Sequence, residues 1–345
     1  MGVFVALLIF SVVILVHEFG HFIFAKMNHV GVIEFSLGMG PRLLSKQIGD
    51  TRFSLKLLPI GGSCNMVGED MASDAEDSFG NTSVWSRISI VFGGPLFNFI
   101  LAFMLALIVI GIAGYDPAVL HNLGTKPTSI LEAGLQDGDK IIELDGVNIY
   151  NYREIVDLLS MNKDAEAVEF VYERNGEINS TVVIPERTED GRYFYGLPSM
   201  GIREKGSIIK VLQYSILELR YWIKTTILSL KELILGNITM DHVSGPVGIV
   251  NFIGGAYKES SKISFLSTIL EMLNISILLS ANLGIINLLP IPALDGGRLF
   301  FLLVEAVIKK RLNQNIEGFI HFIGFVLLMF LMIFVLYNDI RHLIR

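Results

Sequence analysis

Four apolar stretches, each about as long as a membrane-crossing helix, constrain this chain more than any other feature. They occupy residues 3–25, 88–113, 269–289 and 319–336. A helix needs about 20 apolar residues to cross the hydrocarbon core of a bilayer. The composition agrees, because 52% of the 345 residues are hydrophobic and 18% are charged, against about 25% charged residues in a soluble chain. The sequence predicts a polytopic α-helical membrane protein with about four transmembrane helices.

Charge and cysteine content narrow the class further. The net charge of -7 gives no basic field for nucleic acid, so we expect no nucleic-acid partner. Cys64 is the single cysteine and cannot form an internal disulfide. The first apolar stretch has no Lys or Arg before it and no clean small-residue cleavage site after it. We therefore interpret it as a retained helix and not as a cleaved signal peptide.

A fifth stretch, residues 208–235, is apolar but interrupted by charges. These charges are Lys210, Glu218, Arg220, Lys224, Lys231 and Glu232. Such a pattern fits an amphipathic helix at the membrane interface better than a helix that spans the membrane.

Basic residues predict the orientation of the helices. The segment between the first two stretches carries Lys26, Arg42, Lys46, Arg52, Lys56 and Arg87. The segment between the last two carries Arg298, Lys309, Lys310 and Arg311. Both segments are expected in the cytoplasm by the positive-inside rule, and two spans separate them, so the two expectations agree. Residues 114–268 then lie outside the cytoplasm, although the tail residues Arg341, His342 and Arg345 weakly oppose this orientation.

The first apolar stretch contains a metal-binding pattern, His17-Glu18-Phe19-Gly20-His21. Residues at i and i+4 lie on one face of a helix, so His17 and His21 can bind one zinc ion. Glu18 can then act as general base on a water at the open metal position. The alternative is a pair of structural histidines in a packed interior. Ionisable groups at membrane depth are costly and need partners or a function, which favours the metal site.

The end of the third stretch offers a third metal ligand. Pro290 and Pro292 break the helix, and Gly296 and Gly297 permit irregular backbone. Irregular backbone at membrane depth persists only where protein or a water-filled cavity satisfies it. Asp295 follows the break and can complete a His2Asp site, although an N-cap role for this aspartate is the alternative.

The two motifs together resemble those of the site-2 protease family of intramembrane zinc metalloproteases. The HExxH motif lies in the first membrane helix, and Asn287-x-x-Pro-x-Pro-x-Leu-Asp-Gly-Gly lies in a later one. The segments 93–98, 35–41 and 57–62 are also similar to that family. The resemblance covers essentially the whole chain. It is closest to the bacterial branch typified by the regulator-of-sigma-E protease. The sequence has room for one PDZ domain.

The resemblance implies roles for individual residues. His17, His21 and Asp295 would bind Zn2+, and Glu18 would be the catalytic base. Asn287 would hydrogen-bond the substrate backbone or stabilise the oxyanion, a role open to a buried amide. A satisfied polar group at a helix end is the alternative for Asn287.

Three further substrate contacts are implied less directly. The first is Asn98, for which interhelical packing with Gly93 and Gly94 is the alternative. In the family, residues near 35–58 form a membrane-associated β-hairpin whose edge meets the substrate. The alternation in residues 51–57 is consistent with a strand, so Phe53 and Leu55 are expected to contact an added substrate strand.

The resemblance and the pattern together predict four regions. Residues 1–113 form the first membrane region with the hairpin, and residues 114–203 form an inserted extracytoplasmic α/β PDZ domain. Residues 204–265 form an amphipathic linker, and residues 266–345 form the second membrane region. Within the PDZ-like region, residues 133–146 match the strand–turn–strand signature, and Asn151 is expected to cap a helix with Glu154 at the capping-box position.

The predicted function is that of a zinc metalloendopeptidase in the cell membrane with its active site near the cytoplasmic side. The family cuts single-span membrane proteins, such as anti-sigma factors or signal-peptide remnants, in regulated intramembrane proteolysis. A peptide ligand of the PDZ domain is a further expected partner. The alternatives are a membrane metal or ion transporter, because broken helices also mark transport sites, and an inactive PDZ-bearing scaffold.

Overall fold

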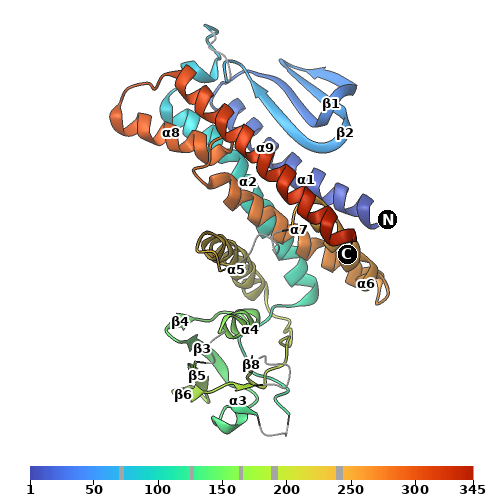
Figure 1. Ribbon diagram of the computed structural model, residues 1–345, viewed down its shortest axis with the longest axis vertical. Helices are drawn as coiled ribbons and strands as arrows, with labels where there is room; N and C mark the ends of the chain where they lie inside the picture. Colours follow the sequence, from blue (N-terminus) through green and yellow to red (C-terminus); the bar gives the residue numbers. More distant parts are fainter. Residues whose placement is uncertain (70–73, 125–127, 163–165, 188–192, 238–243, 345) are drawn as a thin grey trace. The chain divides into compact units, whose positions relative to one another are not determined.

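The computed structural model describes residues 1–69, 74–124, 128–162, 166–187, 193–237 and 244–344 (Figure 1). The chain divides into two compact units. The first combines Met1–Ala106 with Trp222–Arg345, and the second is Leu107–Tyr221.

Four long apolar helices cover the predicted membrane segments. They are α1 (Gly2–Met27), α2 (Val84–Ala113), α7 (Phe265–Leu288) and α9 (Gln314–Ile344). Among the described residues these four are long and apolar enough to cross a membrane. Their spanning portions differ in burial, from 28% of the span in α2 and α7 to 6% in α9. Among these candidate spans, that of α9 is therefore the most exposed.

The break after α7 occurs where the two prolines predict it. Leu289 adopts an extended conformation, and α8 (Asp295–Ile308) starts six residues later. Pro290 and Pro292 lack N–H groups and cannot continue the helix. A helix that starts near Gly297 was expected only in the alternative in which Asp295 is its N-cap; the observed α8 has Leu294 as its N-cap and Asp295 as its first residue.

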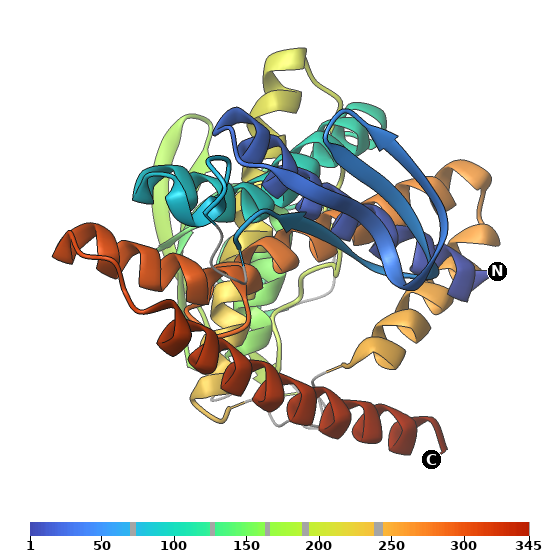
Figure 2. The same ribbon diagram turned by 90° about the horizontal axis from the view of Figure 1, so that it is seen from above.

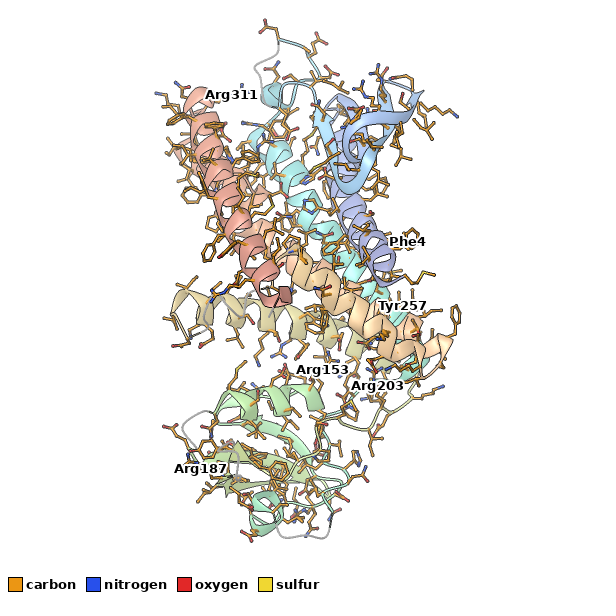
Figure 3. All side chains as sticks on the ribbon, turned by 45° about the vertical axis from the view of Figure 1, so that its right-hand side comes forward. Phe4, Arg153, Arg187, Arg203, Tyr257 and Arg311 are labelled. Carbon is orange, nitrogen blue, oxygen red and sulfur yellow. The ribbon has the colours of Figure 1, made fainter. Side chains whose placement is uncertain are left out.

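Helix α6 (Pro246–Ser261) is held at its start by a residue of α9. The carboxylate of Asp339 accepts hydrogen bonds from Gly245 N and Gly248 N, at 2.9 and 2.8 Å. These amides belong to the first turn, which has no acceptors inside the helix. The other side of α6 packs beside the start of α1, near Phe4 and Tyr257 in Figure 3, where Gly2 and Gly254 bring the two backbones together.

Helices α1 and α2 approach each other at glycines. A Cβ on Gly93 would lie 2.8 Å from the carbonyl oxygen of Gly20, and a Cβ on Gly20 would overlap the carbonyl of Gly93. Since real Cβ atoms do not make such contacts, only glycine allows this backbone separation at both positions. Buried side chains that include Ile90 and Val91 of α2 extend this contact to α8.

Strands β1 (Val32–Ile48) and β2 (Thr51–Met66) form the predicted hairpin, but they fold back on themselves (Figure 2). Residues 34–37 pair with residues 52–55 along one edge and with residues 62–65 along the other. Residues 42–48 pair with residues 51–56. Segment 51–56 is thus paired on both sides, and segment 61–66 lies at an edge.

A cluster of polar contacts around the buried carboxylate of Glu34 fixes this hairpin. Arg42 donates hydrogen bonds to both carboxylate oxygens of Glu34, at 2.6 and 3.2 Å, and the Ser54 hydroxyl donates at 2.6 Å. The hydrogen bonds from Arg42 are the main cause that lowers the pKa of Glu34 to about 2, and Lys56 adds attraction. Glu34 therefore stays ionised and joins three segments of the folded-back hairpin.

The second unit is an α/β module. Its sheet has the order β4-β3-β5-β6, with β3 (Lys140–Leu144), β4 (Val147–Asn148), β5 (Val168–Arg174) and β6 (Glu177–Val183). The shorter elements are α3 (Ser129–Glu132), β7 (Glu186–Arg187) and β8 (Tyr193–Phe194). Helix α4 (Tyr152–Met161) starts at the predicted cap, since Asn151 Oδ1 accepts from Glu154 N at 2.9 Å. Buried side chains such as Phe170, Ile155 and Leu144 form the core.

Helix α5 (Ile208–Ile234) covers the predicted amphipathic stretch. Within the second unit, its first part is tied to α4 by polar contacts. The pairs are Glu218 with Arg153, Arg220 with Glu154 and Tyr221 with Asp157, at 3.2, 3.0 and 2.6 Å. The sheet module of the second unit therefore includes the start of α5, whereas the predicted regions divide the chain at residue 204. An interfacial position for α5 stays a prediction.

Candidate metal and catalytic site

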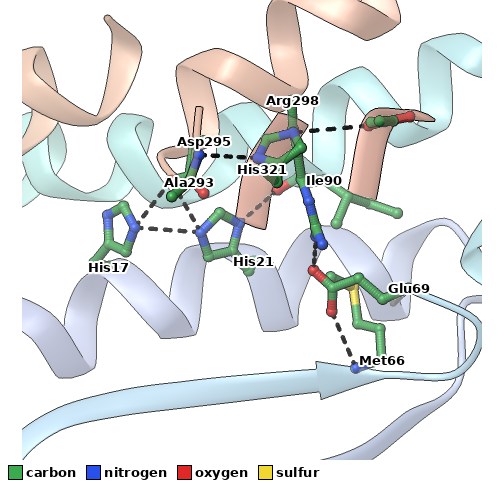
Figure 4. A network of polar contacts seen from close by, with 10 residues as sticks. His17, His21, Met66, Glu69, Ile90, Ala293, Asp295, Arg298 and His321 are labelled. Carbon is green, nitrogen blue, oxygen red and sulfur yellow. Dashed lines mark hydrogen bonds and ion pairs between the residues drawn. The ribbon is translucent and has the colours of Figure 1, made fainter. Parts of the chain in front are cut away.

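Helix α1 places two imidazoles side by side. His17 and His21 are one turn apart, both are buried, and their Nε2 atoms are 3.3 Å apart. The rings meet edge to face with centroids 4.9 Å apart. The i, i+4 spacing therefore produces the convergence that the motif predicts (Figure 4).

Asp295, the first residue of α8, reaches both imidazoles. Its Oδ2 atom lies 3.1 Å from His17 Nε2 and 3.3 Å from His21 Nε2. These three side chains are the group in the described residues that is able to hold a metal ion. Asp295 is 274 positions from His21 and 278 from His17 in sequence, and it reaches them because the break after α7 turns the start of α8 toward α1.

The three atoms fit a tetrahedral metal ion. Ligand atoms about 2.0–2.1 Å from zinc in tetrahedral geometry are separated by about 3.3–3.4 Å. The three observed separations are 3.1, 3.3 and 3.3 Å. Asp295 Oδ2 is buried and receives no hydrogen bond. Three electron-pair donors that converge on a single position form a suitable ligand set for Zn2+.

The far nitrogen of each imidazole has a partner that leaves Nε2 available. His21 Nδ1 donates to the carbonyl oxygen of Ile90 at 2.9 Å. A carbonyl accepts only, so the proton is on Nδ1 and the Nε2 lone pair is directed to the site. Such partners orient metal-binding imidazoles and set their tautomer.

Asn98 is the corresponding partner of His17. It is fully buried, and its amide lies 3.1 Å from His17 Nδ1. Its Oδ1 atom lacks a hydrogen-bond partner. Exchanging the amide oxygen and nitrogen would let Oδ1 accept from His17 Nδ1–H and satisfy both groups. This contact favours a role in orienting the His17 ring, and contact of Asn98 with substrate stays a prediction.

Gly94 has no side chain, and the two imidazoles occupy the space that a side chain would fill. A Cβ at this position would overlap His21 Nε2 and lie 2.8 Å from His17 Cε1. Helix α2 therefore contacts the two rings directly through backbone at Gly94.

The remaining predicted residues border the three donor atoms. The amide nitrogen of Asn287 lies 3.5 Å from His17 Nε2. Glu18 is partly exposed and lies against β2, where a Cβ on Gly62 would be 2.9 Å from Glu18 Cγ. Both positions suit the predicted roles, which stay predictions.

The hairpin edge that faces Glu18 is a different one from the edge expected. Phe53 packs among aromatic rings, with centroids 5.7 Å from both Phe22 and Phe35. Leu55 pairs with Leu37 on one side and with Leu44 on the other. A strand paired on both sides cannot accept another strand, whereas segment 61–66 lies at an edge of the hairpin. Side-chain contact of Phe53 or Leu55 with substrate stays a prediction.

A cavity of about 1100 Å³ opens beside Asp295. Its lining includes two ion pairs, Arg87 with Glu305 and Arg298 with Glu69. His321 of α9 also lines it and accepts a hydrogen bond from Ala293 N at 2.9 Å.

His321 and the carbonyl of Ile90 were not predicted from the sequence, because no local pattern indicates them. Asn98 was predicted as a substrate contact, with interhelical packing as the alternative, and its contact with His17 was not predicted.

The chain belongs to Peptidase family M50, whose profile matches residues 5–331. It is 36% identical to a provisionally named zinc metalloprotease of Clostridium acetobutylicum, over 98% of this chain and 97% of that protein. It is 29% identical to zinc metalloprotease RasP of Geobacillus kaustophilus, over 97% and 96%. It is 28% identical to the regulator of sigma-W protease RasP of Bacillus subtilis, over 98% and 97%. The chain is thus a zinc metalloprotease of the site-2 protease type, as its motifs predicted.

Proposed function

We propose that this enzyme performs regulated intramembrane proteolysis and cuts single-span membrane proteins within or beside their membrane segment. One observation carries the proposal: His17 and His21 lie inside a candidate membrane span, and Asp295 reaches them just beyond another. The proposed substrates are anti-sigma factors or signal-peptide remnants. The name of the Bacillus subtilis relative, which refers to sigma-W, supports the first of these.

In this proposal the chain's own groups divide the work. His17 Nε2, His21 Nε2 and Asp295 Oδ2 hold zinc, while Ile90 O and Asn98 fix the two rings. Bound zinc supplies Lewis acidity that polarises the scissile carbonyl and lowers the pKa of a water toward about 7.

Glu18 and Asn287 act on the substrate. Glu18 takes a proton from the attacking water and returns it to the leaving amine. Asn287, beside His17, donates its amide hydrogen to the substrate backbone or to the developing oxyanion.

The substrate strand is proposed to add to segment 61–66 of β2. This segment pairs with β1 along one side, and its Gly62 lies beside Glu18. An extended strand exposes a peptide bond that a helix protects by hydrogen bonding its carbonyls. The membrane segment of a substrate therefore unwinds before it is cut.

A cross-linking experiment tests this edge. Asn65 is exposed on segment 61–66, and Leu44 is exposed on the opposite edge of the folded-back hairpin. In a Glu18→Gln, Cys64→Ala background, Asn65→Cys is expected to form a disulfide with a cysteine near the scissile bond of the substrate. Leu44→Cys is the matched control and is expected to form none. Equal cross-linking at both positions would contradict the assigned edge.

Cleavage of a reporter tests the proposed reaction. Wild-type protein in lipid vesicles is incubated with a single-span protein of the anti-sigma type, and the product termini are mapped by mass spectrometry. We expect the cut within or beside the apolar segment, because two of the donor residues, His17 and His21, lie in a candidate membrane helix and Asp295 reaches them just beyond another. Cuts confined to soluble loops would contradict the proposal.

The proposed topology places the hairpin and the metal site near the cytoplasmic side and the second unit outside. The positive residues of the hairpin and of the segment after α8 support it. We also propose that the second unit is a single PDZ domain that binds an extended peptide at a strand edge. Its antiparallel sheet and capped α4 support this assignment. Membership of a peptidase family disfavours the transporter and scaffold alternatives.

A further inference from the structure

The segment between α7 and α8, which ends at Asp295, has little internal hydrogen bonding. Pro290 and Pro292 have no amide hydrogen to donate. Ile291 N donates to Leu289 O at 2.6 Å, and Leu294 N donates to Ile291 O at 3.1 Å. The Ala293 amide instead donates to a side chain 28 positions away, the Nδ1 atom of His321.

Ala293 also adopts an unfavourable backbone conformation. Its φ is +78°, a left-handed value that a residue with a Cβ rarely takes. A residue held in such a conformation needs fixed contacts around it. Two residues further on, Asp295 Oδ2 lies 3.1 and 3.3 Å from the imidazole nitrogens. A relaxed Ala293 would redirect the chain immediately before this carboxylate.

Helix α9 is fitted closely to this turn. Gly324 is one turn beyond His321, and a Cβ there would lie 2.6 Å from the carbonyl oxygen of Pro292. The His321 ring also packs edge to face against Phe301 of α8, with centroids 5.8 Å apart. The imidazole therefore has a fixed place between α8 and the turn, as Figure 4 shows for its contact with Ala293.

We propose that His321 is a positioning residue for the metal site. By accepting the Ala293 amide hydrogen, it holds the left-handed turn that directs Asp295 toward His17 and His21. An amide N–H can only donate, so His321 Nδ1 carries no proton and the neutral ring is protonated on Nε2. That atom faces Glu317 Oε1 at 4.0 Å.

The test measures zinc affinity of the full chain in detergent, by competition with a chelator and by metal analysis. His321→Leu removes the acceptor, and we expect zinc affinity to fall roughly 10- to 100-fold, as for other residues that orient metal ligands. His321→Gln keeps an acceptor oxygen and is expected to retain most of the affinity. The activity of His321→Leu is expected to recover at saturating zinc.

A second substitution separates positioning from general damage to the fold. Ala293→Gly removes the cost of positive φ, so it is expected to restore part of the affinity in the His321→Leu background. If His321→Leu lost zinc affinity only because the protein misfolds, this change would not rescue it.

The inference rests on the proposed zinc site, and its failure is distinguishable from failure of that site. If wild-type protein binds no zinc, the proposed ligands are wrong. If wild-type protein binds zinc and His321→Leu binds it equally well, only the role of His321 is overturned. Equal loss in His321→Leu and His321→Gln, without rescue by Ala293→Gly, would also overturn it.

Discussion

Replacing Glu18 by Gln is expected to abolish peptide cleavage while zinc stays bound. The amide cannot take a proton from water, and a positioned general base contributes about 10²–10⁴-fold to rate. Glu18 is not one of the three convergent donor residues, so metal content is expected to match wild type. The measurement compares the cleavage rate of the membrane reporter with zinc content in the same preparation.

Glu271→Gln is the matched control for this experiment. Glu271 is another carboxylate in a candidate membrane helix, α7, and lies outside the site. It is expected to leave the cleavage rate within a few-fold of wild type. Cleavage by Glu18→Gln at the wild-type rate would remove Glu18 from the mechanism. Loss of zinc together with activity would show that Glu18 acts on the metal and not as a base.

Gly94→Ala is expected to remove zinc and activity together. The added methyl group would overlap His21 Nε2 and crowd His17 Cε1. Inserting a carbon into a fully packed contact costs about 1–3 kcal/mol, which corresponds to about 10- to 100-fold in zinc affinity if the rings move. Zinc affinity and reporter cleavage are measured on the same protein.

Gly111→Ala provides the control in the same helix. No atom lies within 4 Å of a Cβ built at Gly111, so this change tests only the replacement of a helical glycine by a better helix former. We expect wild-type zinc affinity and cleavage. Normal zinc binding by Gly94→Ala would show that α2 can move away from the imidazoles, contrary to the packing described.

The sequence predicted the features that depend on local pattern. Apolar length located α1, α2, α7 and α9, because a membrane helix needs a continuous apolar run. The i, i+4 spacing predicted that the imidazoles of His17 and His21 would meet. The prolines after Leu289 predicted the helix break that brings Asp295 to them.

Features that depend on contacts between distant segments were not predicted. The folded-back hairpin places segment 51–56 inside a ladder, and alternation alone cannot tell an inner strand from an edge strand. Asn98 and His17 are 81 positions apart, and His321 and Ala293 are 28 apart. Only the packing of helices brings these groups within hydrogen-bonding distance.

The glycine contact between α1 and α2 has a consequence for how a polypeptide enters the active centre. With Gly20 and Gly93 already at backbone contact, any sideways parting of these two helices would leave a gap along a close-packed seam. The substrate is therefore expected to enter from the lipid on a side other than the contact between α1 and α2. The candidate span of α9 is the least buried of the four, at 6%, so the flank along α9 is where we expect entry.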